Sequence, residues 1–319
     1  MSGPVRVGVV GLGRMGLNHI RVLSLLKSAE IRCVCDSDSD TRERIAAATG
    51  ARAVGDLEEM AGEIDALIVA SPTVTHADYV KRAAHSVRNI FVEKPLADTL
   101  ESARELERLA EAKGLNLQVG FIERFNPAVQ QMKKVLDGSD RVISVDFTRT
   151  NKISARITDV DVILDLMIHD IDLAMHLNGP VAGVSAHGVA SDGMIEFASA
   201  VLTHESGSFS RILASRLTEK KMRTIQATCR DMFVDCDLLR KEIHISRQSQ
   251  VVQPDGGPYT ITALEETLEV QPHEALLLEL QAFLESCTGR PVASAPGPQA
   301  GRAAMEVSDA IRQAIANAA

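Results

Sequence analysis

Tryptophan is absent from this sequence of 319 residues, and aromatic residues together make up only 3%. Basic residues are outnumbered as well, since 34 Lys and Arg stand against 43 Asp and Glu, which gives a formal net charge of −9. Surfaces that bind nucleic acid usually need basic patches and stacking rings. The composition therefore argues against a nucleic-acid partner, and the acidic balance is interpreted as a source of solubility.

Long apolar runs and disulfide patterns are also missing. No window approaches the ~18 uninterrupted apolar residues of a membrane span, so no membrane insertion is expected. The first residues, MSGPVRVGVVGLG, lack the charged region and cleavage site of a signal peptide. Five cysteines, an odd number without a CxxC pair, favour reduced thiols over a disulfide framework. These absences predict a cytoplasmic protein.

Short β-rich runs and helical patterns alternate over residues 1–121, as in VRVGVVG, DALIVAS and TLESARELERLAEAKG. This alternation predicts an α/β Rossmann domain with a parallel, doubly wound sheet. In residues 122–319, strand candidates instead follow one another with Gly, Asp and Ser between them, which predicts an α+β domain with a large, mostly antiparallel open sheet. The segment 250–262 is expected to be a loop, and the C-terminal helix is a candidate to pack back on the first domain.

A glycine motif in VVGLGRMG directly follows the first predicted strand and opens a helix. In this context Gly11 allows a tight turn, Gly13 lets the backbone approach a pyrophosphate, and Gly16 lets helix and strand pack closely. The helix N-terminus faces the anion. The motif therefore predicts a dinucleotide site, to which Arg14 and Met15 are added as candidate contacts.

Asp36 ends the second predicted strand, 20 residues after Gly16. A carboxylate at this place accepts hydrogen bonds from the adenosine ribose hydroxyls and repels a 2′-phosphate. The following SDSD contains no Arg or Lys, so NAD is favoured over NADP. The alternatives are a Rossmann domain without a nucleotide, or with another nucleotide in the same crevice.

Two later strands end in polar residues that should lie at the cofactor edge of the sheet. The fourth strand runs into VASPTVTH and the next one ends in VEKPLA. His76 is equally well explained as a helix-cap or surface histidine, and a lysine is usually a surface residue. The position of Lys94 after an apolar strand nevertheless favours a functional role. The candidate cofactor contacts here are Ser71, Pro72, Thr73, His76, Glu93 and Lys94.

The stretch VILDLMIHDIDLAMHL combines an apolar composition with four ionisable side chains, Asp165, His169, Asp172 and His176. Their spacing of four, three and four residues places them on one stripe of a helix. Burying such groups without partners costs several kcal/mol, so these four residues are expected to have specific partners or a function. Asp-x-x-x-His also has the spacing of two metal ligands, but no matching third and fourth ligands are found, and no metal is expected.

Taken together, these motifs resemble the glucose-fructose oxidoreductase, inositol dehydrogenase and MocA family, abbreviated Gfo/Idh/MocA. The resemblance rests on the glycine motif, EKP at residues 93–95, GFIERFNPA at the domain junction, DLMIHDIDL and LLLELQAFLESCTG. It implies that Lys94, Asp165 and His169 form a catalytic triad. It further implies that the second domain carries substrate contacts and joins subunits into a homodimer or homotetramer.

Within this family, GFIERFNPAV and ILDLMIHDIDLA are most similar to the UDP-N-acetylglucosamine 3-dehydrogenases. This similarity implies NAD-dependent oxidation of the sugar 3-hydroxyl, before an amination that leads to diamino-sugar lipid A. Met167 stands where many members have glycine, so the substrate preference of the polyol dehydrogenases is not carried over. The alternatives are a UDP-N-acetylglucosaminuronate 3-dehydrogenase, a polyol or inositol dehydrogenase, and a regulatory protein that binds NAD without catalysis.

Oxidation of a secondary alcohol requires removal of the hydroxyl proton while a hydride leaves the carbon. His169 suits the base, since imidazole titrates closest to neutrality, and Asp165 one turn earlier can orient it. Lys94 can donate to the hydroxyl oxygen. Which of Lys94 and His169 accepts the proton stays open at this point.

Further substrate contacts are expected at the domain junction and on the apolar helix. Arg124 could bind the diphosphate bidentately, or it could pair with Glu123. Asp172 could contact a sugar hydroxyl or hold a structural donor. Asn126 is the remaining candidate, while Asp170 is assigned no role, and surface cations at Lys152, Arg156 and Lys220 are weaker candidates for the diphosphate.

Overall fold

The structure is a computed structural model that describes residues 3–151, 160–252, 260–290 and 292–318. The chain divides into two compact units. Unit 1 comprises Met1–Phe125 and Glu274–Glu306, and unit 2 comprises Asn126–His273 and Val307–Ala319. This division differs from the expected single boundary after residue 121, because a segment close to the C-terminus completes unit 1.

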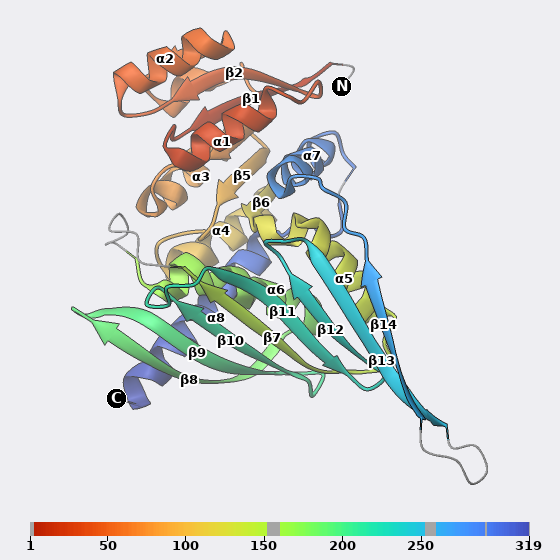
Figure 1. Cartoon of the computed structure of the whole chain (residues 1–319). Helices are drawn as coiled ribbons and strands as arrows, with labels where there is room; N and C mark the ends of the chain where they lie inside the picture. The colour runs from red at the N-terminus through yellow and green to blue at the C-terminus, as the bar shows by residue number, and fades with distance from the viewer. Residues whose placement is uncertain (1–2, 152–159, 253–259, 291, 319) are drawn as a thin grey trace. The chain divides into compact units, whose positions relative to one another are not determined.

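The sheet of unit 1 is parallel throughout, as predicted for a Rossmann domain (Figure 1). Its six strands have the order β3-β2-β1-β4-β5-β6, so the chain reverses direction across the sheet between β1 and β4. Ligands of such sheets bind at the carboxyl ends of the strands beside this reversal. The strands are β1 (Val5–Val10), β2 (Ala29–Cys35), β3 (Arg52–Val54), β4 (Ala66–Val69), β5 (Asn89–Glu93) and β6 (Asn116–Gly120).

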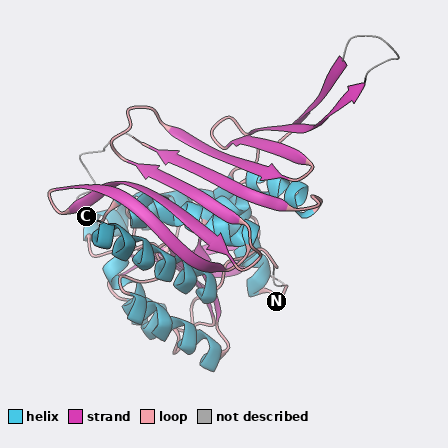
Figure 2. Ribbon diagram, turned by 90° about the horizontal axis from the view of Figure 1, so that it is seen from below, coloured by secondary structure: helices cyan, strands magenta, loops and turns pink. Residues whose placement is uncertain are grey.

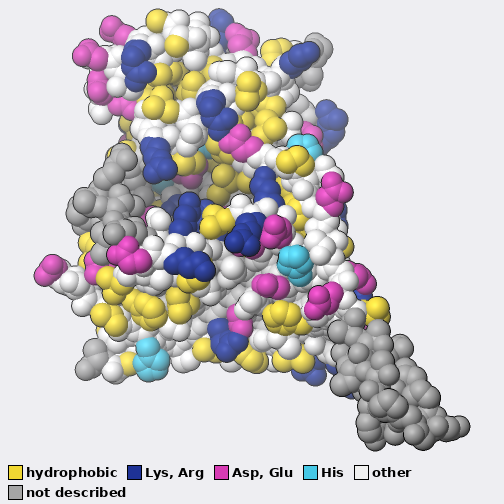
Figure 3. All heavy atoms as spheres, viewed as in Figure 1, with side chains coloured by type: hydrophobic (Ala, Val, Ile, Leu, Met, Phe, Trp, Pro, Cys, Tyr) yellow, Lys and Arg dark blue, Asp and Glu magenta, His cyan; other side chains and the backbone are white. Residues whose placement is uncertain are grey.

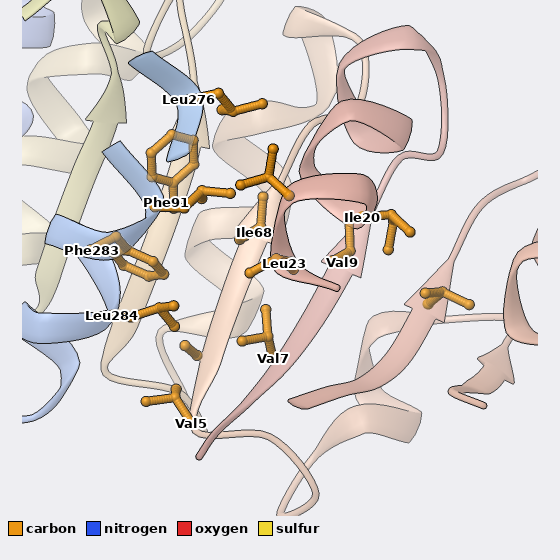
Figure 4. Packing of buried hydrophobic residues seen from close by; sticks show 14 of the residues in the cluster. Val5, Val7, Val9, Ile20, Leu23, Ile68, Phe91, Leu276, Phe283 and Leu284 are labelled. Carbon is orange, nitrogen blue, oxygen red and sulfur yellow. The ribbon is translucent and has the colours of Figure 1, made fainter. Parts of the chain in front are cut away.

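Helices cover this sheet, and one of them comes from the far end of the sequence. Phe283 of α7 packs on Phe91 of β5 with ring centroids 5.6 Å apart, and Leu276 and Leu284 join the same buried cluster (Figure 4). Burying one such side chain stabilises the fold by about 1.5–3 kcal/mol, which explains why α7 belongs to unit 1. The elements are α1 (Arg14–Leu23), α2 (Ser39–Thr49), α3 (His76–Ala83), α4 (Leu100–Lys113), α7 (Ala275–Cys287) and the 3₁₀ helices η1 (Leu57–Met60), η2 (Thr73–Thr75) and η3 (Ile122–Phe125).

Unit 2 contains an eight-stranded sheet of order β14-β13-β12-β11-β7-β10-β9-β8. Among the described strand pairs of this sheet only β7–β10 is parallel, so the prediction of a mostly antiparallel sheet is confirmed. The strands are β7 (Val142–Thr150), β8 (Val181–Ser191), β9 (Met194–His204), β10 (Phe209–Ser215), β11 (Met222–Cys229), β12 (Met232–Asp237), β13 (Glu242–Val252) and β14 (Thr260–Leu268).

The predicted loop over residues 250–262 is wrong at both ends, because β13 extends to Val252 and β14 begins at Thr260. The strand β14 lies at the edge of the sheet, and its residues 264–267 are all exposed. An edge strand of this kind buries no alternate side chains. It therefore lacks the period-two hydrophobic signal by which strands are found in a sequence.

One face of the sheet in unit 2 is covered and the other faces outward (Figure 2). Along β9, Ala198, Ala200 and Leu202 are buried, whereas Ser199 and Val201 between them are exposed. Figure 3 shows hydrophobic side chains among charged ones over the strands of this unit. The covering elements are α5 (Pro127–Asp137), the π-helix η4 (Ile163–Met167), α6 (Ile168–Asn178) and the last part of α8 (Pro298–Ala318).

Among the described residues, no helix combines the length and the apolar composition that crossing a membrane would need. The longest helix, α8, contains several charged side chains, including Arg302, Glu306 and Arg312.

Candidate active site

The glycine motif forms the turn between β1 and α1, and each of its glycines meets a different steric demand. Gly11 has a φ of +86°, and a Cβ there would lie 2.4 Å from the backbone nitrogen of Ser71. A Cβ at Gly16 would lie 1.9 Å from the carbonyl oxygen of Gly11, so helix and strand touch at this point. Gly13, the N-cap of α1, has nothing within 4 Å of its Cβ position. The turn is therefore closed on the protein side and open at Gly13, where a pyrophosphate would approach.

Asp36 follows β2 and folds its carboxylate back onto the glycine turn. Its Oδ2 accepts a hydrogen bond of 2.6 Å from the backbone N–H of Leu12, and Oδ1 accepts one of 2.9 Å from Asp38. This places the carboxylate beside the turn, as the ribose contact of NAD requires. Arg42 donates a hydrogen bond to the Asp36 carbonyl oxygen at 2.8 Å. This cation lies two residues beyond the SDSD segment, residues 37–40, which itself contains no Arg or Lys.

The segment after β4 is tied to the segment after β5 by His76. The two ring nitrogens of this buried histidine lie 2.9 Å from the carbonyl oxygens of Pro95 and Ser71. Burial lowers the pKa of the His76 imidazole, although both carbonyl contacts act in the opposite direction. The bond between Lys94 and Pro95 is cis. His76 thus holds two strand ends together, and cofactor contacts by His76 and by residues 71–73 stay predictions.

The EKP motif ends β5, and Glu93 is its anchored member. Glu93 Oε1 lies 2.7 Å from Nε2 of the fully buried His19, and Oε2 accepts from the backbone N–H of Lys94 at 3.3 Å. The His19 ring stands edge-on to Phe91, with centroids 5.3 Å apart. A Cβ at Gly120 would lie 2.9 Å from Glu93 Oε2, so a larger residue there would displace this carboxylate. The assignment of Glu93 as a cofactor contact stays a prediction.

His19 was not singled out in the sequence. Its position three residues after Gly16, on the same face of the helix, is the signal that could have revealed it. Of the remaining candidates in this turn, Arg14 is exposed and Met15 is half-buried at the start of α1, and their contacts with the cofactor stay predictions.

The apolar stretch after residue 161 begins as a π-helix and continues as the α-helix α6. Asp165 lies in η4 and His169 is the second residue of α6, and both are half-buried. Four residues correspond to about one turn in either helix type, so the two side chains share a face. Asp165 Oδ2 accepts a hydrogen bond of 3.0 Å from Nη2 of Arg216. Arg216 directly follows β10 and stands 51 positions away in the sequence, which is why no local motif revealed it.

The start of this helix is capped by a second carboxylate. Asp161 Oδ1 accepts from the backbone N–H groups of Ile163 and Leu164 at 3.1 and 3.0 Å. Its Oδ2 accepts from Arg312 of α8 at 2.7 Å. The capping arrangement satisfies donors that a helix N-terminus otherwise leaves open.

The other ionisable residues of this helix divide into different environments. Asp172 is buried, with 1% of its surface exposed, while His176 is half-buried. Asp170, to which the sequence assigned no role, forms a bidentate pair with Arg149 of β7, with two contacts of 2.8 Å. This pair fastens α6 to the sheet. Substrate contact by Asp172 stays a prediction.

The junction motif supplies the end of unit 1 and the beginning of unit 2. Glu123 is buried and Arg124 half-buried within η3. Asn126 caps α5, since its side chain accepts from the backbone N–H of Ala128 at 3.1 Å. Substrate contacts by these three polar residues stay predictions. Lys152 and Arg156 lie outside the described residues, and the carbonyl oxygen of Lys220 accepts a hydrogen bond from Thr150 Oγ1.

Within unit 1 the structure brings together the glycine turn, Asp36 and the ends of β4 and β5. Within unit 2 it places Asp165, His169 and Asp172 on one helix. Within the described part of the chain, no three His, Cys, Asp or Glu side chains are arranged to hold a metal ion. The residues of unit 1 fit a dinucleotide by the open position at Gly13 and the orientation of the Asp36 carboxylate.

Comparison with known proteins agrees with this geometry. Residues 5–121 match a family model described as "Oxidoreductase family, NAD-binding Rossmann fold", and residues 141–232 match the GFO/IDH/MocA C-terminal domain. A UDP-N-acetylglucosamine 3-dehydrogenase of Acidithiobacillus ferrooxidans is 30% identical over 292 residues, which cover 90% of each chain. The chain belongs to the Gfo/Idh/MocA family of oxidoreductases. It is accordingly an NAD-dependent dehydrogenase.

Other relatives of this Gfo/Idh/MocA protein include the scyllo-inositol 2-dehydrogenase (NAD(+)) of Bacillus subtilis, 30% identical over 314 residues that cover 89% of this chain and 86% of that one. A solved structure of the Acidithiobacillus ferrooxidans enzyme superimposes with a TM-score of 0.86 at 27% identity, covering 98% of this chain and 99% of the other. The Rossmann fold, the second domain and the NAD cofactor predicted from the sequence are thereby confirmed.

Proposed function

We propose that this protein oxidises the 3-hydroxyl of UDP-N-acetylglucosamine to a ketone with NAD, upstream of an amination that leads to diamino-sugar lipid A. The observation that carries the proposal is the 30% identity to a UDP-N-acetylglucosamine 3-dehydrogenase over 90% of both chains. Asp165 and His169 on one helix face supply the acid–base chemistry that such a reaction requires.

The oxidation breaks two bonds of the substrate, the C–H bond at C3 and the O–H bond of the hydroxyl. NAD held by the glycine turn and Asp36 would supply the acceptor for the hydride that leaves the sugar C3. The hydroxyl proton passes to either His169 or Lys94, and the other of these two donates a hydrogen bond to the same oxygen. Asp165 orients the His169 ring and stabilises the imidazolium that forms when the ring takes the proton. Asp172 and the junction residues Glu123, Arg124 and Asn126 are assigned to the sugar and the diphosphate.

A free polyol is the second candidate substrate. The scyllo-inositol 2-dehydrogenase of Bacillus subtilis reaches the same 30% identity over 89% of this chain. The oxidation chemistry would be unchanged, and only the residues that hold the remainder of the substrate would differ. The uronate of UDP-N-acetylglucosamine is a further candidate of the nucleotide-sugar class.

A cytoplasmic homodimer or homotetramer forms part of the same proposal. The outward face of the sheet in unit 2 carries exposed apolar side chains among polar ones, and this composition suits contact between subunits. Large exposed apolar residues on that face include Val189, Val201 and Phe233.

The deciding experiment follows NADH absorbance with NAD and UDP-N-acetylglucosamine, its uronate or inositol at equal concentration. The proposal expects the highest kcat/KM with UDP-N-acetylglucosamine, and loss of at least about 100-fold in kcat for His169→Gln and Lys94→Met. Turnover with inositol alone would replace the substrate and leave the family assignment standing. NAD binding without turnover of any of the three would instead support a regulatory protein, and recovery of EDTA-abolished activity by a divalent ion would point to a metal enzyme.

A further inference from the structure

Arg216 is a buried cation at the end of β10, and 6% of its side chain is exposed. Its Nη1 donates to the carbonyl oxygen of Val160 at 2.7 Å, and its Nη2 donates to Asp165 Oδ2 at 3.0 Å and to the Asp161 carbonyl oxygen at 3.3 Å. These acceptors all belong to the segment that opens the helix carrying His169. One guanidinium therefore donates hydrogen bonds to both the backbone and the acidic side chain at the start of this helix.

A fixed guanidinium has two effects on a carboxylate. It sets the plane and rotamer of the carboxylate, because the fork of donors is rigid and its other donor is held by the backbone. It also offsets the negative charge where water is largely excluded, and there the interaction is stronger than in solvent. The orientation and the partly offset charge of the carboxylate in turn influence any group that interacts with it.

We propose that Arg216 is a positioning residue for the oxidation, which holds Asp165 through Oδ2 and thereby fixes the carboxylate on the helix face that it shares with His169. The inference rests on the proposed function of Asp165 and His169. Arg216 touches neither the hydroxyl nor the cofactor in this role. It acts by orienting Asp165 and by limiting how strongly Asp165 attracts the proton on His169.

A matched control exists on the same helix start. Arg312 also binds a carboxylate there, but that carboxylate is Asp161, which caps the helix and lies one turn before Asp165. Loss of either arginine removes a cation from the same turn, although Arg312 is 33% exposed and Arg216 only 6%. Only loss of Arg216 releases Asp165. The surrounding elements also carry the Arg149–Asp170 pair, Asp172 and His176. Asp309 of α8 contacts Arg312 at 3.3 Å, and Arg211 of β10 pairs with Asp146 of β7.

The first test compares kinetics of Arg216→Gln and Arg312→Gln with NAD and UDP-N-acetylglucosamine, and with inositol in parallel. Arg216→Gln is expected to lower kcat about 100-fold, because a catalytic group is misplaced, while KM for both substrates changes less than about threefold. Arg312→Gln is expected to lower the melting temperature less than Arg216→Gln does, because the Arg312 side chain is 33% exposed, and to keep kcat within about threefold of wild type. Arg216→Lys should recover part of kcat, and guanidinium ions should raise the kcat of Arg216→Ala but not that of Asp165→Asn.

The second test needs no turnover. Histidine ring signals are followed by NMR against pH in the wild type, with His169→Gln to assign the resonance. Removal of the cation in Arg216→Gln leaves Asp165 uncompensated, so His169 should bind its proton more tightly and titrate about one pH unit higher, whereas Arg312→Gln should leave it in place.

The outcomes separate the two levels of the argument. Equal losses of kcat and of melting temperature in Arg216→Gln and Arg312→Gln, with no change in the titration of His169, would reduce Arg216 to a structural residue. Wild-type kcat in Asp165→Asn and His169→Gln would overturn the proposed function instead. In that case a shifted His169 titration in Arg216→Gln would still establish the coupling between the two side chains.

Discussion

Each unit of this protein contains a predicted motif residue that is hydrogen-bonded to a buried partner far away in the sequence. In unit 1, Glu93 of the EKP motif is bound by His19, 74 positions earlier. In unit 2, Asp165 is bound by Arg216, 51 positions later. The partners differ in kind, since His19 lies on the helix of the glycine motif, whereas Arg216 follows a sheet strand outside any motif.

This difference shows two ways of placing a functional side chain. Unit 1 relies on close backbone approach, in which glycines at positions 11, 16 and 120 leave room for neighbouring atoms. Unit 2 relies on buried ion pairs, in which Arg149 and Arg216 tie one helix to the sheet. Steric placement is sensitive to added atoms, and electrostatic placement is sensitive to removed charge.

The largest effect is expected from Gly11→Ala. The substitution forces a φ of +86° on a residue with a Cβ and brings that Cβ within 2.4 Å of the Ser71 backbone. We expect a loss of at least about 3 kcal/mol in the free energy of unfolding, measured by denaturant titration.

Gly13→Ala is the control for this change, because nothing lies within 4 Å of its Cβ position. It should keep the melting temperature within about 2 °C of wild type and weaken NADH binding measured by fluorescence, since the added methyl group meets the cofactor. Equal destabilisation by the two alanines would show that the turn is not closed in the way described.

The next largest effect tests electrostatic placement in unit 2. Arg149→Met leaves Asp170 in a site where both side chains are 3% exposed, and it should cost about 3–5 kcal/mol of unfolding free energy. Arg211→Met is its partner experiment, because Arg211 binds Asp146 of the same strand, β7, with 62% of its side chain exposed. That change should cost less than about 1 kcal/mol. Chemical denaturation of both variants provides the comparison, and similar costs would contradict the assignment.

A smaller effect is expected for His19→Phe, which retains the ring packing on Phe91 and removes the nitrogen that binds Glu93. A buried carboxylate that loses a hydrogen-bond donor costs about 1–3 kcal/mol in unfolding free energy. Because Glu93 also accepts from the Lys94 backbone, kcat should fall in the same variant. The exposed His85→Phe serves as the control, and unchanged kcat and melting temperature in His19→Phe would remove the positioning role from His19.

The smallest effect concerns pH and the buried histidines His76 in unit 1 and His204 in unit 2. Burial lowers the pKa of both imidazoles below the ordinary value of 6.5. Above that value the ring is neutral in both the folded and the unfolded chain. As the pH falls below it, the unfolded chain takes up the proton first and stability decreases, by up to about 1.4 kcal/mol for each unit of pKa difference.

Melting temperatures between pH 8 and pH 5 measure this slope. His76→Gln and His204→Gln should each flatten it, because glutamine does not titrate. A slope that is unchanged in both variants would assign the acid sensitivity to other groups.

The sequence allowed much of this structure to be predicted, and its omissions share a cause. The Rossmann half followed from alternating strands and helices, and Gly11, Gly13, Gly16 and Asp36 fall at the turn expected of them. The edge strand β14 was missed because its exposed residues have no buried alternation. Helix α7 was found as a helix, but its membership of unit 1 depends on packing against Phe91.

By itself the sequence determined most of the helices and strands, the dinucleotide turn and the pair of Asp165 and His169 on one helical face. These features depend on residues within a few positions of one another, where backbone geometry imposes a period or a glycine. Only the tertiary structure decided that His19 binds Glu93, that Arg216 binds Asp165 and that Asp170 is structural. Such pairs lie tens of residues apart, so burial and distance between them exist only once the chain has folded.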